Sequence, residues 1–151
     1  EFRRVLFRSR EDEIKQAIEI AQGKEFVENM KDGYNSEIAQ GGINISGGQK
    51  QRLAIARIIA KKPGILIFDD SFSALDFKTD KKLREELKRN LKDTTSVIVA
   101  SRIGTIMNAD QILVLDGSKL VGKGTHEELL ENCEVYKEIA LSQLSAKELE
   151  G

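Results

Sequence analysis

The sequence is poor in the residues that mark several classes of protein. It holds one cysteine, Cys133, so no disulfide can form within the chain. A single proline among 151 residues argues against a proline-rich low-complexity segment. The charges nearly cancel, at 24 Lys plus Arg against 25 Asp plus Glu, which excludes nucleic-acid binding driven by a large positive excess. No apolar run approaches the roughly 20 residues of a membrane-spanning helix, so we expect a soluble chain.

The first nine residues, EFRRVLFRS, differ from the rest of the chain. They carry three arginines among scattered apolar residues and fit neither helical nor strand periodicity. The string matches the translation, in one reading frame, of a common sequencing-library adapter, so we predict that residues 1–9 are not native. The alternative is a natural basic arm. If the prediction holds, the native sequence upstream of Arg10 is missing.

The remaining residues alternate between helical and strand patterns, and a hydrophobic share of 40% is sufficient for one globular domain. Ile65 to Phe68 is an uninterrupted apolar run, which is typical of a strand buried on both faces of a parallel sheet. A second buried strand is expected at 96–100, after a helical segment, so the crossover should be right-handed and the strands parallel. The patterns predict helices at 11–22, 24–31, 46–62, 78–91, from Thr125, and at 134–144, a hairpin at 112–121, and a loop at 34–45.

Four residues at a predicted helix start, Ser46-Gly47-Gly48-Gln49, form a candidate anion site. The first backbone N–H groups of a helix lack intrahelical partners, and the helix dipole adds about half a positive charge there. Two glycines let a phosphate approach the backbone closely, and the serine hydroxyl can donate to the same oxygens. The alternative is an ordinary joint between a loop and a helix.

Two carboxylates, Asp69 and Asp70, follow the first predicted strand. Ligands of parallel sheets bind beyond the carboxyl ends of the strands. An aspartate at that place can hold the magnesium ion of a nucleotide, directly or through water, as a Walker B carboxylate does. The alternative is that both aspartates are solvated turn residues.

The combination of NISGGQKQRLAIAR, ILIFDDSFSALD and VASR resembles the nucleotide-binding domain of ATP-binding cassette (ABC) transporters. The resemblance runs from about residue 11 to the C-terminus, and the later segment GTHEELL is similar to exporter-type members. It implies an α/β fold of the P-loop NTPase (RecA-like) class, with a partial parallel sheet, flanking helices and part of the ABC helical subdomain. It also implies a helical subdomain remnant at 10–62 and the C-terminal part of the ATP-binding core at 63–151.

The resemblance assigns a role to each motif. Ser46 to Gln49 would be the signature motif, and Asp69 would be the Walker B carboxylate and metal ligand. The loop that crosses to the partner domain would comprise Ser73, Ala74, Leu75 and Asp76. In this family ATP and Mg²⁺ lie between two nucleotide-binding domains, and the signature motif of one domain closes over phosphates that the other domain holds.

Two positions depart from the family pattern. After the Walker B aspartate the family usually has a glutamate that polarises the attacking water, and here Asp70 is shorter by one methylene. A withdrawal of about 1 Å can cost about 100-fold in rate. The switch position, usually a histidine that contacts the γ-phosphate, is Ser101, whose hydroxyl is short and uncharged. We therefore expect a degenerate catalytic site in this chain, paired in a heterodimer with a hydrolysing partner that uses the intact signature motif.

Other parts of the family pattern are absent from the sequence. No GxxxxGK[ST] phosphate-binding loop occurs, and the family places its membrane-spanning helices in other segments. The resemblance implies a parent protein at the cytoplasmic face of a membrane, with no nucleic-acid partner. Two alternatives remain open: an ABC-superfamily nucleotide switch in DNA repair or translation, and a truncated product without activity. His126, the only histidine, is interpreted as structural.

We predict that the chain alone neither hydrolyses ATP nor binds it tightly. The reason is that the missing loop provides most of the backbone donors for the β- and γ-phosphates. Isothermal titration calorimetry checks the prediction. A dissociation constant below about 100 μM, equivalent to about −5.5 kcal/mol, would overturn it.

Overall fold

The structure is a computed structural model that describes residues 10–143. The predicted adapter segment, residues 1–9, lies outside the described residues, as do residues 144–151. The chain divides into two compact units between Val99 and Ala100, and each unit is described here by itself. The division at residue 62 that the sequence suggested differs from this boundary and stays a prediction.

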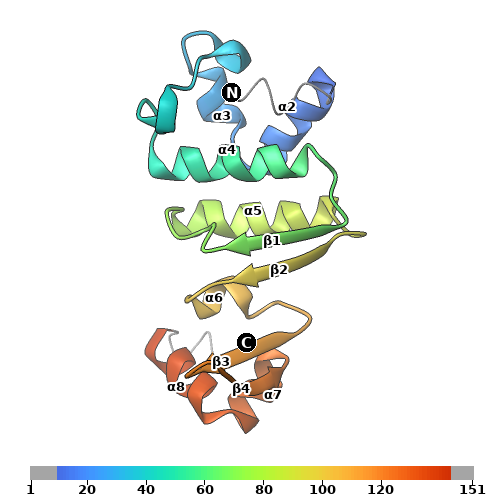
Figure 1. Cartoon of the computed structure of the whole chain (residues 1–151), viewed down its shortest axis with the longest axis vertical. Helices are drawn as coiled ribbons and strands as arrows, with labels where there is room; N and C mark the ends of the chain where they lie inside the picture. Colours follow the sequence, from blue (N-terminus) through green and yellow to red (C-terminus); the bar gives the residue numbers. More distant parts are fainter. Residues whose placement is uncertain (1–9, 144–151) are drawn as a thin grey trace. The chain divides into compact units, whose positions relative to one another are not determined.

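The first unit packs helices against a short parallel sheet (Figure 1). Its main elements are α2 (Glu11–Ile20), α3 (Lys24–Glu28), α4 (Gly47–Ile59), β1 (Ile65–Asp69), α5 (Phe77–Asn90) and β2 (Thr95–Val99). The two strands pair in parallel, with Ile67 opposite Val97. The predicted parallel strand–helix–strand unit is therefore confirmed, and the chain is a mixed α/β protein as expected.

One hydrophobic core holds the first unit together. Helix α4 buries Leu53, Ala56 and Ile59, which recur at spacings of three and so share one face of the helix. Strand β1 adds Leu66 and Phe68, and the ring of Phe68 lies 5.2 Å from that of Phe72 between centroids. Helix α5 adds Leu83 and Leu87, one turn apart. The core thus fixes α4, β1 and α5 relative to one another.

The expectation that both strands are buried on two faces is wrong for the described residues. Leu66 and Phe68 are 1% exposed, but the alternate side chains Ile65 and Ile67 are 65% and 66% exposed. In β2, Val99 is 55% exposed. Within the first unit, the sheet therefore has one covered face and one apolar face that none of its described residues covers.

Element boundaries differ from the expected ones where the backbone turns left-handed. Helix α4 ends at Ile59 rather than near residue 62, and Lys62, just before Pro63, has a φ of 47°. A residue that precedes proline is kept out of the helical region. The predicted loop at 34–45 overlaps one short 3₁₀ helix, η1 (Gly33–Asn35), and contains another, η2 (Gln40–Gly42), in which Gly41 has a φ of 72°.

In its described part, residues 100–143, the second unit pairs a hairpin with three helices. Its elements are α6 (Ile103–Ile106), β3 (Ile112–Asp116), β4 (Lys119–Gly124), α7 (His126–Asn132) and α8 (Glu134–Gln143). The predicted hairpin is confirmed as an antiparallel pair, and its two turn residues, Gly117 and Ser118, both have positive φ, as a type I′ turn requires. Helix α6 was not expected from the sequence. None of the helices within residues 10–143 combines the length and apolar character needed to cross a membrane.

A helix cap and a buried contact between two side chains organise the second unit. Thr125 and Glu128 form the predicted capping box, since the Thr125 N–H donates to Glu128 Oε2 at 2.8 Å. His126 is buried, and its Nδ1 lies 2.7 Å from the hydroxyl oxygen of Tyr136, which is 1% exposed. Burial, helped by the negative charge of Glu127, raises the pKa of Tyr136 to about 12. This contact gives His126 a packing role inside the second unit.

The raised pKa of Tyr136 predicts a loss of stability in alkali. The folded state holds the phenol proton more tightly than the unfolded state, so this stabilisation is complete below pH 10 and disappears as the pH rises through about 12. In Tyr136→Phe this pH-dependent part should vanish, so the free energy of unfolding should fall less between pH 10 and 12 than in the unsubstituted protein. Urea unfolding followed by circular dichroism measures it.

The matched control is Tyr34→Phe, since Tyr34 is partly exposed in the first unit and its pKa is also raised by burial. This variant should keep the loss that Tyr136 causes. An equal alkaline loss in Tyr136→Phe and in the unsubstituted protein would contradict the account.

Candidate functional site

The start of α4 is built by a reciprocal cap. Ser46 Oγ accepts a hydrogen bond from the Gln49 N–H at 3.2 Å, and Gln49 Oε1 accepts one from the Ser46 N–H at 2.9 Å. The backbone of Ser46 is extended, with φ −68° and ψ 161°, so the helix begins abruptly at Gly47. This capping box fixes the direction in which the first turn presents its backbone donors.

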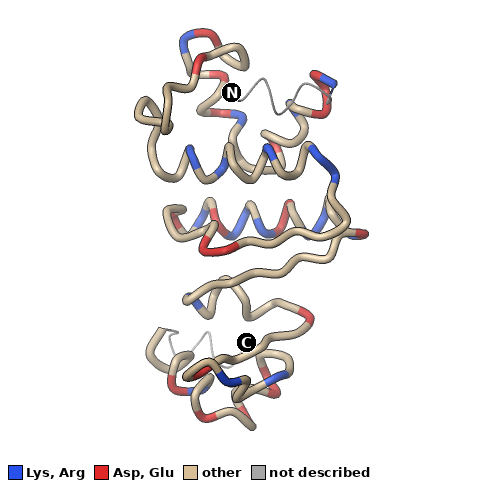
Figure 2. The backbone as a smooth tube through the Cα atoms, viewed as in Figure 1, with Lys and Arg blue, Asp and Glu red and all other residues tan. Residues whose placement is uncertain are grey.

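The first turn of α4 is open to an anion. Ser46 and Gly47 are exposed, and Gly48 is half-buried. No acidic residue lies in this turn, so nothing in it opposes the positive end of the helix dipole. In Figure 2 the first turn of α4 carries no red, the colour of Asp and Glu. The arrangement meets the physical needs of a phosphate site at a helix start.

The two predicted carboxylates lie at the carboxyl end of β1. Both Asp69 and Asp70 are exposed. Asp70 is left-handed, with a φ of 46°, and its N–H donates to the Val99 carbonyl at 3.1 Å, which ties the residue to the end of β2. In Figure 1, β1 ends at the same side of the first unit at which α4 begins. The fold thus brings the candidate anion site and the carboxylates to one edge.

The loop between β1 and α5 has a mixed character. Ser73 and Ala74 are exposed, whereas Leu75 is 6% exposed and packs into the core of its own unit. Asp76 caps α5, since its Oδ1 accepts a hydrogen bond from the Thr79 N–H at 3.0 Å. Hydrogen bonding by the Thr79 side chain, and then by the Thr79 N–H, lowers the pKa of Asp76. Within the predicted partner-contacting loop, the side chain of Leu75 is therefore occupied by its own fold.

Gln51 is a residue of this region that the sequence analysis missed. Its Oε1 accepts a hydrogen bond from the Ala74 N–H at 3.0 Å, and its Nε2 donates to Ser73 Oγ at 3.2 Å and to the Asp70 carbonyl at 3.4 Å. One side chain of α4 thus holds the loop that carries Asp70. The only hint in the sequence was a polar residue beside the apolar face of this helix.

Gly48 makes the second contact between α4 and the same loop. A Cβ at this position would lie 3.0 Å from the carbonyl oxygen of Ala74 and 3.6 Å from the Leu75 side chain. The absence of a side chain therefore lets the helix approach its own loop closely. Gly48 and Gln51 are three residues apart, so both contacts lie on one face of α4.

Arg52 ties the first turn of α4 to the preceding helices. Its guanidinium donates to the Gln22 carbonyl at 2.7 Å and to the Gly48 carbonyl at 3.3 Å, and it lies 4.7 Å from the centre of the Phe26 ring. Burial lowers the pKa of Arg52, although the nearby charges of Asp76 and Glu25 oppose the shift. The hydrogen bonds of Arg52 therefore join α4 to the segment after α2, and its guanidinium is used within the fold rather than for an anion.

Ser101, the predicted switch residue, belongs to the second unit. It is exposed, and its carbonyl accepts a hydrogen bond from Gln143 Nε2 at 2.9 Å. Gln143 Oε1 in turn accepts from the Ile103 N–H at 2.9 Å, so α8 braces the segment that carries Ser101. The pairing of Ser101 with Asp70 stays a prediction, because the two units are described separately.

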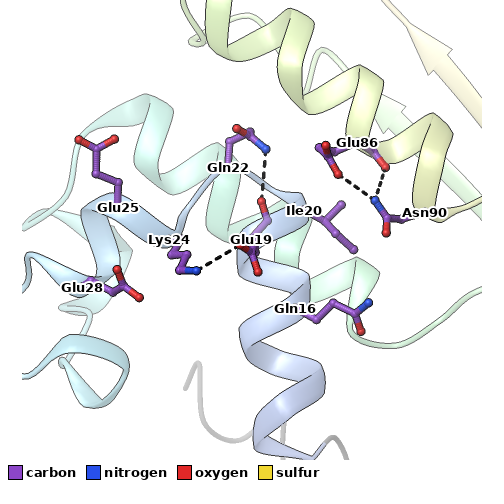
Figure 3. A pocket seen from close by; sticks show the side chains of 9 residues that line it. All are labelled: Gln16, Glu19, Ile20, Gln22, Lys24, Glu25, Glu28, Glu86 and Asn90. Atoms are coloured by element: carbon purple, nitrogen blue, oxygen red, sulfur yellow. Dashed lines mark hydrogen bonds and ion pairs between the residues drawn. The ribbon is translucent and has the colours of Figure 1, made fainter.

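A hollow in the first unit lies away from these motifs. It measures about 630 Å³ and is lined by α2, α3 and α5. Figure 3 shows four glutamates around it, and Lys24 pairs with one of them, Glu19, at 3.2 Å. None of the motif residues lines this hollow. It is an acidic surface depression, separate from the edge where α4 begins.

The donor set at the edge fits a nucleotide-bound magnesium ion better than a metal held by protein alone. Across the part of the chain that the structure describes, no three His, Cys, Asp or Glu side chains gather to hold a metal. Protein sites for Mg²⁺ commonly use one or two carboxylates together with phosphates and water. Asp69, exposed at the strand end, meets this need as a single ligand.

Comparisons with known proteins place these features in a family. The ABC transporter family model matches residues 6–73. An uncharacterized ABC transporter ATP-binding protein of Mycobacterium bovis is 47% identical over 133 residues, which is 88% of this chain and 22% of the relative. A protein of Rickettsia conorii, provisionally named an export ATP-binding/permease protein, is 41% identical over 89% of this chain and 23% of its own length.

A solved structure agrees with the sequence matches. A bacterial Atm1-family ABC exporter with ATP bound has a TM-score of 0.90 and 33% identity, over 95% of this chain and 25% of that protein. The chain therefore spans about a quarter or less of the relatives it matches. The expected P-loop NTPase fold is confirmed by this structural match. With its helix-start motif and strand-end carboxylates in place, the chain belongs to the ATP-binding domains of ABC transporters.

Proposed function

We propose that the chain is part of the ATP-hydrolysing engine of an exporter, acting at the cytoplasmic face of a membrane. The start of α4 closes over the terminal phosphates of an ATP molecule that a second nucleotide-binding domain holds. The observation that carries this proposal is the exposed, capped and acid-free first turn at Ser46 and Gly47. The relatives described as export proteins favour this function over a nucleotide switch in DNA repair or translation.

Each motif residue has a physical task in this proposal. The N–H groups of Gly47 and Gly48 and the hydroxyl of Ser46 bind phosphate oxygens, and the Ser46–Gln49 cap keeps them aligned. Asp69 holds the magnesium ion of the nucleotide bound to its own domain. When bound there, the ion would supply positive charge that polarises the phosphates. Ser73, Ala74 and Asp76 present the loop that faces the partner.

The proposal also includes an unequal pair of ATP sites. At this chain's own site, Asp70 takes the place of a glutamate and Ser101 that of a histidine. Both side chains are therefore too short to reach the attacking water and the γ-phosphate. Two identical copies would then place two intact signature motifs over two weak sites. A heterodimer avoids this outcome, because a partner with Glu and His at the two positions hydrolyses ATP against Ser46, Gly47 and Gly48 of this chain.

Ser46→Arg in the complete transporter should abolish ATP hydrolysis by the complex. The longer, bulky side chain would fill the space of the phosphate and break the cap, and loss of even one transition-state donor can cost about 100-fold or more in kcat. The matched control is Ser142→Arg, on the exposed face of α8, which should leave the rate unchanged. A wild-type ATPase rate in Ser46→Arg would show that the assignment is wrong.

Asp70→Glu combined with Ser101→His should restore hydrolysis at this chain's own site. The test uses a complex whose partner is silenced by replacing its own hydrolytic glutamate with glutamine, so any ATPase activity arises at the restored site. The expected gain is about 100-fold, because the glutamate regains about 1 Å of reach. Each single substitution serves as a control with a smaller gain. A double variant that stays as slow as the starting complex would contradict the proposed degeneracy.

A further inference from the structure

The contacts of Gln51 suggest a role beyond holding the fold. Gln51 lies on α4 one turn after Gly47 and Gly48, and it hydrogen bonds to the loop after β1 at three places. Both ends of its amide are used: the oxygen accepts from Ala74, and the nitrogen donates to Ser73 and to the Asp70 carbonyl. A side chain that is satisfied at both ends has one preferred position, so it resists displacement of either partner.

The loop end of this contact is itself cross-linked. Ser73 Oγ donates to the Asp70 carbonyl at 3.0 Å, and the Ser73 N–H donates to the same oxygen at 3.4 Å. Asp70 is anchored in turn to the end of β2 through the Val99 carbonyl. A displacement of the Gln51 side chain would therefore shift the backbone of Asp70. The side chain of Asp70 stands at the position of the hydrolytic carboxylate.

The helix end of the contact is close-fitting. Gly48 lets the helix approach the loop, since a Cβ at this position would lie 3.0 Å from the carbonyl oxygen of Ala74. The first turn is held by the Ser46–Gln49 cap on one side and by Arg52 on the other. The first turns of α4 and the loop 70–74 are therefore expected to move together. They are joined by the hydrogen bonds of Gln51 and packed closely at Gly48.

We propose that Gln51 is a positioning residue that couples the two ATP sites of the assembled transporter. Through Gln51, closure of α4 on the partner's nucleotide moves the loop that carries Asp70 at this chain's own site. Movement of that loop in turn shifts the start of α4. This inference rests on the proposed function, because it requires α4 to face the partner's nucleotide. Gln51 itself touches no reacting atom. Its effect is on the placement of groups that do.

The test compares Gln51→Leu with Gln51→Glu in the complete transporter assembled with its partner. Leucine keeps the size of the side chain and removes all three hydrogen bonds. Glutamate keeps the acceptor for the Ala74 N–H but loses both donated bonds. We expect kcat for ATP to fall about 10- to 100-fold in Gln51→Leu and by an intermediate factor in Gln51→Glu, with KM within about twofold of wild type in both, because misplacement by a fraction of about 1 Å affects the rate more than binding.

Hydrogen–deuterium exchange supplies a readout that separates positioning from folding. A peptide covering residues 70–76 should exchange faster in Gln51→Leu, while peptides from α2 and α5 keep their wild-type rates. A purely structural role would instead raise exchange throughout the first unit and raise KM together with the loss of kcat, and this pattern would overturn the inference. Arg57→Leu, an exposed position on the same helix, is the matched control and should change neither quantity.

The outcomes distinguish the inference from the function on which it rests. Wild-type kcat in Gln51→Leu, together with an inactive Ser46→Arg, overturns the inference and leaves the proposed function intact. Wild-type activity in Ser46→Arg overturns the proposed function itself. If Gln51→Leu fails to assemble, Gln51→Glu decides alone: a reduced kcat with an unchanged KM supports the coupling, and a wild-type kcat overturns it.

Discussion

Close packing of the start of α4 against the loop that follows β1 is the constraint on which the functional geometry depends. The contact is made where a side chain is absent, at Gly48, and where an amide can bond in both directions, at Gln51. It brings a helix N-terminus, with its unpaired N–H groups, to the same edge of the fold as two strand-end carboxylates. Neither group would be informative alone, since capped helices and strand-end aspartates are common.

The same contact explains why the two glycines of the motif differ. Gly47 is exposed, so its backbone is available to a ligand from outside the chain. A Cβ at Gly48 would lie 3.0 Å from the Ala74 carbonyl oxygen, so the lack of a side chain there serves the protein's own packing. The two glycines of one motif therefore differ: Gly47 is the one for which we propose a binding role, and Gly48 has a packing role within the same turn of α4.

The sequence predicted features that local chemistry determines. The Ser46 and Thr125 caps, the parallel strands and the hairpin turn at Gly117 all follow from short patterns, and the structure confirms them. Burial on both faces of β1 was wrong, because an apolar run reports what a strand could bury and not which segments are present to cover it. Gln51 was missed because its partners lie 19 to 23 residues away, beyond the reach of any periodicity.

The central claim is that the start of α4 touches the terminal phosphate position of a nucleotide held by another domain. Vanadate occupies that position when it is trapped with nucleotide, and ultraviolet light then cleaves the backbone next to the residues that contact it. In the complete transporter, illumination with ATP, Mg²⁺ and vanadate should cut this chain at Ser46 or Gly47, and omission of ATP should abolish the cut. A chain that stays intact at Ser46 while the partner's phosphate-binding segment is cut would contradict the account.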